Sequence, residues 1–374
     1  MGGAVPLSSL LAIVPTTALL LVGSAVFAFA LAAVFAPFVG LAARRLGMLD
    51  LPGGRRLHPR PIPRPGGFAI AAAFGVAIFL FCGQPFLIPE EVRSSRFTLT
   101  AFAALLGVLV GLVDDFFELR ARWQFLGLMG VAAVIVYAGI RIDFVNDPFD
   151  DGVLQLALPI AVAFTMFWIV GMNVALNFID GLDGLAAGVA AIAALTLGGL
   201  ALLPQVSEPF VAWMAFTLAG AICGFLLFNF HPARLFLGTT GVAFLGTMLA
   251  VLSIFGTSKV AAALLVLGVP IIDTFYVLVR RALTGQPPFA PDRGHFHHRL
   301  LDVGLSHPQA VLVIYAMTAV LGTIAYMTSG RTQLVSFAGF AVLLGVAVVG
   351  LAQRATKASE LDPGLYPSEE ADTA

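Results

Sequence analysis

Apolar stretches separated by short polar segments recur along the whole chain. A stretch of roughly 17–25 apolar residues is long enough to cross the hydrocarbon core of a bilayer as a helix. About eleven such stretches are present, at residues 17–41, 67–83, 97–113, 124–140, 153–176, 185–203, 209–229, 240–256, 260–279, 310–329 and 333–352. The pattern therefore predicts an all-α, polytopic integral membrane protein with about eleven transmembrane helices.

Composition supports the same class. The 374 residues are 59% hydrophobic and 11% charged, and the mean hydropathy is +0.98, which excludes an ordinary soluble domain. Since the loops are short, we expect one transmembrane domain over residues 1–356 and a disordered cytoplasmic tail over 357–374. Cys82 and Cys223 both fall inside predicted spans, which argues against a disulfide framework or a zinc cluster.

Charge predicts the orientation. If the N-terminus lies outside, the odd-numbered connections and the C-terminus are cytoplasmic, and they hold 15 of the 20 Lys and Arg residues. Basic residues are retained on the cytoplasmic side during insertion, so this threading is favoured over its inverse. It also places five polar segments on one side, where they are expected to form one site: residues 44–66, 114–123, 177–184, 230–241 and 280–309.

Two adjacent carboxylates, Asp114 and Asp115, stand where a predicted span ends. Taken alone they fit a solvated helix end as well as a functional site. Ionisable residues at a membrane edge are costly unless they bind something, and other polar clusters are expected nearby. The functional interpretation is therefore favoured.

The second cluster is Asn173, Asn177, Asp180 and Asp183. On a continuing helix these four positions fall within an arc of about 120° and share one face. Alternatively, the glycines at 181 and 184 unwind the segment and bring backbone close to a phosphate, or the polar residues only cap helices. Amide and carboxylate oxygens without a nearby thiolate suit Mg²⁺ or Mn²⁺ on phosphates rather than zinc.

Two basic segments complete the candidate site. The loop with His295, His297, His298 and Arg299 fits either a metal-binding tract or a grip on a nucleotide diphosphate. The grip is favoured because no carboxylate or cysteine ligand accompanies the histidines. The proline-rich loop over 50–67 suits anionic lipid, although positive-inside topology alone explains its arginines. His231 and His307 stand alone and are interpreted as interfacial polar residues.

Six motifs, taken in order, resemble the polyprenyl-phosphate N-acetylhexosamine-1-phosphate transferases, the first membrane enzymes of peptidoglycan, O-antigen and teichoic-acid linkage synthesis. They are the loop over 50–67, the pair Asp114-Asp115, the segment 173–188, Asn229 to Ala233, Pro270 to Thr274, and His295 to His298. The His-x-His-His form is similar to the branch that uses UDP-N-acetylglucosamine rather than UDP-N-acetylmuramoyl-pentapeptide.

The resemblance implies transfer of N-acetylhexosamine-1-phosphate from a UDP-sugar to undecaprenyl phosphate, with Mg²⁺ (or Mn²⁺) and release of UMP. It places the site at the cytoplasmic face of the bacterial inner membrane. The implied partners are polyprenyl phosphate, UDP-N-acetylhexosamine and the membrane, with no nucleic acid; a homodimer is compatible with it.

The resemblance also assigns roles. Asp114 is the candidate general base, and Asp115 and Asp183 shape the field around metal and phosphates. Asn177 and Asp180 hold or orient the metal. The expected substrate-binding residues are Asn173, His295, His297, His298, Arg299, Arg64 and His58.

Three positions depart from the family pattern. Thr239 stands where the family has a metal-ligand Asp, Gln124 where it has Lys, and Leu128 where Gln is common. A neutral hydroxyl binds Mg²⁺ less tightly than a carboxylate. Two hypotheses follow: an active transferase with an altered metal site, and a catalytically weakened relative that binds polyprenyl phosphate or nucleotide sugar in a regulatory or scaffolding role. A transporter is disfavoured because paired broken helices and inverted repeats are not apparent.

Overall fold

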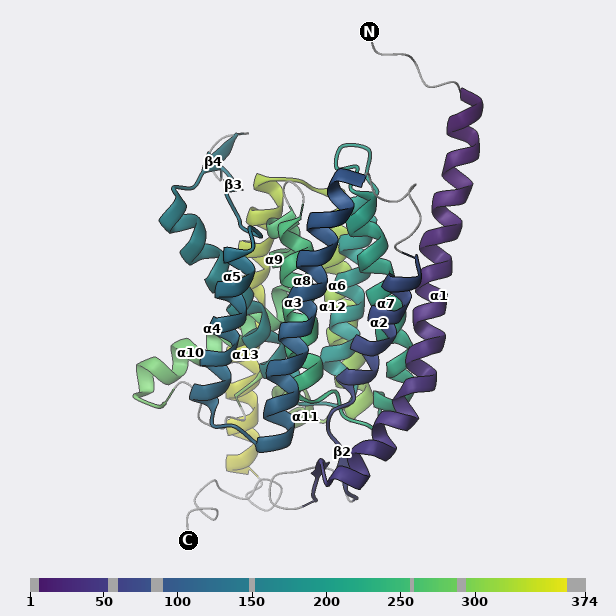
Figure 1. The fold of residues 1–374 in the computed structure, drawn as a ribbon. Helices are drawn as coiled ribbons and strands as arrows, with labels where there is room; N and C mark the ends of the chain where they lie inside the picture. Colours follow the sequence, from purple (N-terminus) through teal and green to yellow (C-terminus); the bar gives the residue numbers. More distant parts are fainter. Residues whose placement is uncertain are drawn as a thin grey trace.

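The computed structural model describes residues 7–52, 60–81, 90–147, 152–255, 259–287 and 294–361. In these ranges the chain is mostly helical (Figure 1). The helices are α1 (Leu7–Leu46), α2 (Gly67–Phe81), α3 (Glu90–Phe117), α4 (Ala121–Tyr137), α5 (Leu158–Ile179), α6 (Leu185–Ala201), α7 (Pro209–Asn229), α8 (Gly238–Ile254), α9 (Lys259–Val266), α10 (Gly268–Thr284), α11 (Phe296–Asp302), α12 (His307–Met327) and α13 (Arg331–Leu361).

Two short antiparallel ribbons accompany the helices. β1 (Leu49–Asp50) pairs with β2 (Ile62–Pro63), and β3 (Phe144–Asn146) pairs with β4 (Val153–Gln155). In Figure 1, β2 lies with α11 at the lower end of the bundle, while β3 and β4 lie at the upper end. The two ribbons therefore mark opposite ends of the molecule.

The helix lengths support a polytopic membrane protein of the all-α class, in which the only strands of the described residues are these two short ribbons. In the described part of the chain, six helices are long and apolar enough to span a bilayer: α1, α3, α5, α7, α12 and α13. The shorter apolar helices α2, α4, α6 and α8 have 15–17 residues. The number of spans predicted from the sequence, about eleven, stays a prediction.

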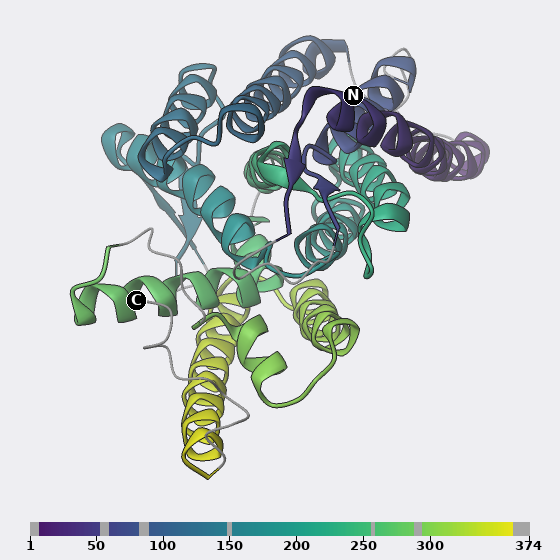
Figure 2. The same ribbon diagram turned by 90° about the horizontal axis from the view of Figure 1, so that it is seen from below.

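The predicted span over 260–279 is not one straight helix. α9 and α10 meet at an angle of 77°. The bend coincides with Gly268 at the start of α10 and Pro270 in its first turn, where proline lacks an N–H and is sterically tolerated. Both views show α10 extending away from the other helices (Figures 1 and 2). Phe275 and Leu283 on this helix are 68% and 82% exposed.

Two further predicted boundaries are corrected. Residues 153–155 form strand β4, and α5 begins only at Leu158, with Pro159 in its first turn. At the other end of the chain, α13 continues to Leu361, so residues 357–361 of the predicted tail are helical. Residues 362–374 lie outside the described part, and their disorder stays a prediction.

Close helix packing depends on small residues. A Cβ on Gly220 or Gly224 of α7 would lie 2.1–2.2 Å from backbone oxygens of α1. These glycines form a G-x-x-x-G pair, the spacing that lets two helices approach closely in a membrane. The facing side of α1 presents Ala28, Ala32 and Ala36, all fully buried. The sequence therefore determines the α1–α7 contact through side-chain size.

The beginning of α8 is enclosed by its neighbours. A Cβ on Gly67 would lie 1.9 Å from the Cα of Gly241, and a Cβ on Gly111 would lie 2.4 Å from the Cα of Thr240. Helices α2 and α3 therefore fit against the first turn of α8 only because these positions are glycine. This packing brings the end of α3, which carries Asp114 and Asp115, next to Thr239.

Candidate active site

A polar pocket of about 930 Å³ opens among the described residues. All five segments that were predicted to share one side contribute to its lining, so their convergence is confirmed. The polar lining residues are Arg44, Asp50, Arg60, Arg64, Asp114, Asp115, Glu118, Gln124, Asn177, Asp180, Asp183, Asn229, His231, Arg234, Thr239, His298 and His307.

Asp114 and Asp115 are both buried but differ in their contacts. Asp114 uses a single oxygen, Oδ1, which accepts hydrogen bonds from the backbone N–H of Leu119 (3.0 Å) and from Gln124 Nε2 (2.7 Å). Asp115 uses both oxygens: Oδ1 accepts from the backbone N–H of Thr239 (2.9 Å), and Oδ2 accepts from the backbone N–H and hydroxyl of Thr240 (2.8 and 2.6 Å). Asp115 therefore caps the N-terminus of α8.

The segment from Asn173 to Asp183 does not continue as one helix. α5 ends at Ile179, Asp180 is its C-cap, and Gly184 has φ of +80°. The expectation that four polar side chains share one helix face is therefore wrong, because the helix ends before Asp180 and Asp183. The segment unwinds after Ile179, as the alternative predicted, and the approach of its backbone to a phosphate stays a prediction. Asn177 and Asp180 remain at the pocket.

Asn173 is buried inside the bundle rather than at the large pocket. Its Nδ2 donates to the backbone oxygen of Ile169 (2.8 Å) and approaches Thr247 Oγ1 (3.3 Å). Its Oδ1 has no hydrogen-bond partner among the described residues. Asn173 lines a cavity of about 20 Å³ together with Asp114 and Asn177, and its predicted role in substrate binding stays a prediction.

The ionisation of the Asp180 carboxylate is strongly perturbed. Burial and the nearby carboxylates of Asp115 and Asp183 raise the pKa of Asp180 to about 7. In the described part of the chain no hydrogen-bond donor reaches this carboxylate. A divalent cation would relieve both the burial of the negative charge and its repulsion from neighbouring acids.

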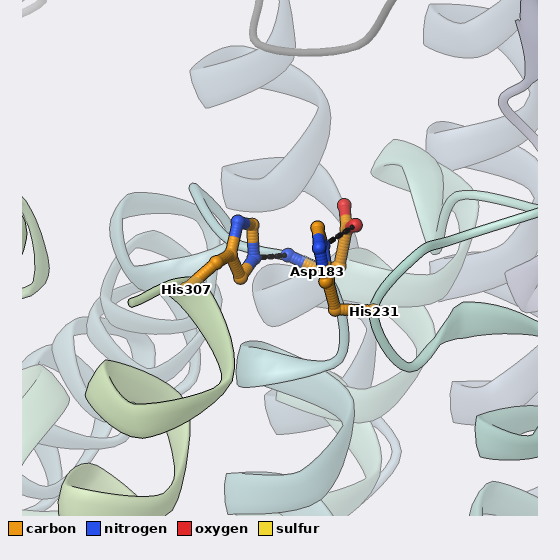
Figure 3. Close-up of side chains that lie close together, drawn as sticks. All are labelled: Asp183, His231 and His307. Carbon is orange, nitrogen blue, oxygen red and sulfur yellow. Dashed lines mark hydrogen bonds and ion pairs between the residues drawn. The ribbon is translucent and has the colours of Figure 1, made fainter. Parts of the chain in front are cut away.

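Asp183 lies between two histidines that were expected to be isolated (Figure 3). His231 Nδ1 is 2.8 Å from Asp183 Oδ2, and the backbone N–H of Asp183 donates to His307 Nε2 at 2.8 Å. The interpretation of His231 and His307 as unrelated interfacial residues is therefore wrong. A signal was available, since each stands at a helix end on the same predicted side as Asp183.

The first loop contributes Arg64. Its guanidinium donates from Nε to Asp50 Oδ1 (2.9 Å) and from Nη1 to Glu118 Oε1. Arg64 thereby joins the β1–β2 ribbon to the end of α3 at the pocket rim. His58 lies outside the described residues, so its predicted role in binding stays a prediction.

The histidine loop places one of its three histidines in the pocket lining, His298. His295 Nδ1 is 2.8 Å from the buried carboxylate of Asp273, so the expectation that no carboxylate accompanies these histidines is wrong. His297 is 1% exposed, and neither ring nitrogen has a hydrogen-bond partner among the described residues. Burial lowers the pKa of the His297 imidazole well below its usual value, so the ring is neutral.

The remaining predicted substrate residue, Arg299, lies beside Asp302, with Nη1 3.7 Å from Asp302 Oδ2. Arg299 is not among the residues that line the pocket. Of the four residues predicted to bind the nucleotide diphosphate, His298 alone lines this pocket. The ring of His297 lies 4.3 Å from the ring of His298, and the binding roles of the four residues stay predictions.

The three departures from the family pattern meet at one place. Gln124, Leu128 and Thr239 all line a cavity of about 20 Å³, together with Asp114 and Asn177. Gln124 donates to Asp114 by a neutral amide, so this carboxylate is hydrogen-bonded without a cation. The three departures therefore change the surroundings of the same two residues, Asp114 and Asn177.

The donor set is compatible with a hard divalent cation. Asn177 and Asp180 supply an amide and a carboxylate, and Thr239 supplies a hydroxyl at the same pocket. Oxygen donors of this kind suit Mg²⁺, and one carboxylate makes a weak site that phosphate oxygens of a ligand would complete.

Comparison with known proteins identifies relatives. Residues 97–257 match the model of Glycosyl transferase family 4. A Bacillus subtilis protein named a probable undecaprenyl-phosphate N-acetylglucosaminyl 1-phosphate transferase is 37% identical over 305 residues, covering 80% of this chain and 82% of the relative. The decaprenyl-phosphate N-acetylglucosaminephosphotransferase of Mycolicibacterium smegmatis is 32% identical over 351 residues, covering 85% of each chain. An undecaprenyl-phosphate alpha-N-acetylglucosaminyl 1-phosphate transferase of Thermotoga maritima is 30% identical over 275 residues, covering 73% and 78%.

Proposed function

The chain belongs to the family of polyprenyl-phosphate N-acetylhexosamine-1-phosphate transferases, and we propose that it transfers N-acetylglucosamine-1-phosphate from UDP-N-acetylglucosamine to undecaprenyl phosphate. UMP is the second product. The reaction is the first membrane step of a cell-envelope glycan pathway. One observation carries the proposal: five segments far apart in sequence meet in a single pocket that combines acids, amides, histidines and arginines.

The chemistry is a phosphoryl transfer. An oxygen of the lipid phosphate attacks the β-phosphorus of the UDP-sugar, and the bond between that phosphorus and the oxygen bridging to the α-phosphate breaks. Charge neutralisation and positioning supply most of the rate acceleration in such reactions. A phosphate monoester with a second pKa of about 6 is already mostly dianionic at neutral pH. A general base therefore has to remove a proton from only a small fraction of the lipid phosphate.

Asp114 suits that task better than Asp115. Its Oδ1 is fixed by Gln124 and Leu119, while Oδ2 has no hydrogen bond to any described residue. Both oxygens of Asp115 accept hydrogen bonds from the start of α8. We therefore assign proton acceptance to Asp114 and a positioning role to Asp115.

Mg²⁺ is the proposed cofactor, with Mn²⁺ as a substitute. When bound, it would neutralise phosphate oxygens and orient the diphosphate. Asn177 and Asp180 would hold it, and the Asp180 carboxylate, which no described donor reaches, supports this assignment. Thr239 would contribute at most a neutral ligand, which makes weak metal affinity the expected property of this chain.

The proposed location is the inner membrane, with about eleven spans, the N-terminus outside and the site at the cytoplasmic face. The predicted cytoplasmic segments hold 15 of 20 basic residues, and all five of the polar segments among them line the pocket. The homodimer stays a prediction.

UMP release by the purified protein tests the proposal. The reaction contains UDP-N-acetylglucosamine, undecaprenyl phosphate and Mg²⁺ or Mn²⁺, with Asp114→Asn as the control. Metal-dependent release that disappears in the control is the expected result. If the protein binds donor or lipid but releases no UMP, it is a weakened relative with a binding role, and the proposal is wrong.

A further inference from the structure

A three-residue group in the pocket lining includes two histidines that have no role in the mechanism described so far. It consists of Asp183 in the turn after α5, His231 in the turn after α7, and His307 at the start of α12 (Figure 3). Both histidines line the pocket. The rings of His231 and His307 stack with centroids 4.4 Å apart and an interplanar angle of 24°.

The hydrogen bonds define the state of each ring. The backbone N–H of Asp183 donates to His307 Nε2, so that nitrogen carries a lone pair and His307 is neutral. His231 Nδ1 faces the carboxylate of Asp183, so it carries the proton and donates. Asp183 Oδ2 also accepts from the backbone N–H of Ala233 at 3.1 Å, which holds the carboxylate in place.

His231 is thus left with one unoccupied nitrogen. Nε2 has no hydrogen bond to any described residue, and the side chain is 38% exposed at the pocket. A carboxylate that fixes one nitrogen of an imidazole orients the other for a ligand. The neutral ring of His307 beneath it adds packing without like-charge repulsion.

A metal ion on all three residues would need different bonding. The atoms lie within 4.8 Å of one another, but the His307 lone pair already accepts from a backbone amide and His231 Nδ1 already donates to Asp183. Coordination would break both hydrogen bonds. The existing contacts describe an oriented histidine more directly than a metal centre.

We propose that His231 is a phosphate-binding residue of this pocket, with Asp183 and His307 as its positioning residues. As an imidazolium, His231 donates through Nδ1 to Asp183 and through Nε2 to a phosphate oxygen, and such charge-assisted bonds are the strong ones. Arg234, three residues after His231, also lines the pocket and brings positive charge to it. The inference rests on the proposed function, because both substrates carry phosphate.

Two substitutions separate ligand binding from packing. In His231→Asn the amide replaces Nδ1 and keeps the contact with Asp183 but removes Nε2. In His231→Gln an amide reaches the position of Nε2 but gives up the contact with Asp183. A phosphate-binding role predicts that His231→Gln retains more ligand binding than His231→Asn, whereas a purely structural role predicts the reverse.

Binding is measured by calorimetry in detergent with UDP, uridine and a short-chain polyprenyl phosphate. We expect His231→Asn to weaken binding of the phosphate ligand by roughly 10- to 100-fold, with uridine binding and thermal unfolding unchanged. Weaker UDP binding assigns the contact to the donor, and weaker polyprenyl phosphate binding assigns it to the acceptor. Adding Asp183→Asn to His231→Asn should weaken binding no further, because Asp183 acts through the ring.

Besides the reversed order of the two variants, three results would overturn the inference. Unchanged binding of both phosphate ligands by His231→Asn would do so while leaving the proposed function intact. Equal losses for uridine and UDP would show that His231 only supports the fold. If the unmodified protein binds neither phosphate ligand, the proposed function fails first and the inference fails with it.

Discussion

Asp115→Asn should destabilise the fold, although the adjacent change Asp114→Asn should not. Asp115 is 7% exposed, and its two oxygens accept three hydrogen bonds from the first turn of α8. An asparagine at this position offers one oxygen and one amide nitrogen. In either orientation the nitrogen faces a backbone N–H, so one buried donor loses its partner and the other bonds lose their charge assistance.

The magnitude follows from those bonds. A hydrogen bond to a charged group is worth about 1.5–3 kcal/mol and an unsatisfied buried donor costs about 1–3 kcal/mol, so the substitution should lower the free energy of unfolding by about 2–4 kcal/mol. Asp114 is the matched control because only Oδ1 accepts. An asparagine keeps both of those bonds with its own oxygen, and the expected loss is under about 1 kcal/mol.

Unfolding by SDS in mixed micelles, followed by intrinsic fluorescence, measures both variants under one condition. The expected pattern is a stable but inactive Asp114→Asn and a destabilised Asp115→Asn. If Asp115→Asn unfolds at the same SDS fraction as Asp114→Asn and both are inactive, Asp115 does not cap α8 in a way that matters for stability. Its charge would then act on the ligands, which is the role that the family resemblance implies.

Three further outcomes are expected. Gly181→Ala should strongly reduce activity because a Cβ there would lie 2.3 Å from Nε2 of the buried His297. Turnover and thermal unfolding of the variant test this, and unchanged values of both would show that the site tolerates the added methyl group. In EDTA, the free energy of unfolding should fall as pH rises from about 4 through about 7, because the folded-state pKa of Asp180 lies above its unfolded value of 3.8. Denaturation at several pH values should show this slope reduced in Asp180→Asn, and an identical slope would refute it. Thr239→Asp alone should raise the affinity for Mg²⁺ but adds a negative charge to an acidic pocket, whereas Thr239→Asp together with Gln124→Lys leaves the net charge unchanged. The effects of the two substitutions on turnover should therefore be non-additive in a double-mutant cycle, and simple additivity would show that the two positions act independently.

Much of the site is accessible from the sequence because membrane insertion limits the alternatives. Spans and basic loops place the polar segments on one side, and a bundle of helices brings their ends together. Insertion topology thus predicts the five segments that line the pocket. It does not place single side chains, since a loop of known position still has many conformations.

Contacts between distant residues escape sequence-based prediction. His231 meets Asp183 across 48 positions and His307 meets it across 124, and no local pattern encodes either pairing. The helix cap formed by Asp115 is hidden for the same reason, because Thr239 lies 124 positions away. The helix break near Pro270 is different, because a proline and a glycine mark it in the local sequence. A prediction that counts only the length of the apolar stretch misses this break.

The amino-acid sequence is sufficient to establish a bundle of membrane helices with one polar end, because the length of each apolar run and the distribution of charge act locally during insertion. It also specifies which residue types gather at that end. Which of them face the pocket and which support it depends on how the helices pack in three dimensions. Glycines at 67 and 111 let α2 and α3 approach α8. Because of this close approach, both oxygens of Asp115 accept hydrogen bonds from the start of α8, whereas Oδ2 of Asp114 has no hydrogen bond to a described residue and can contact a ligand.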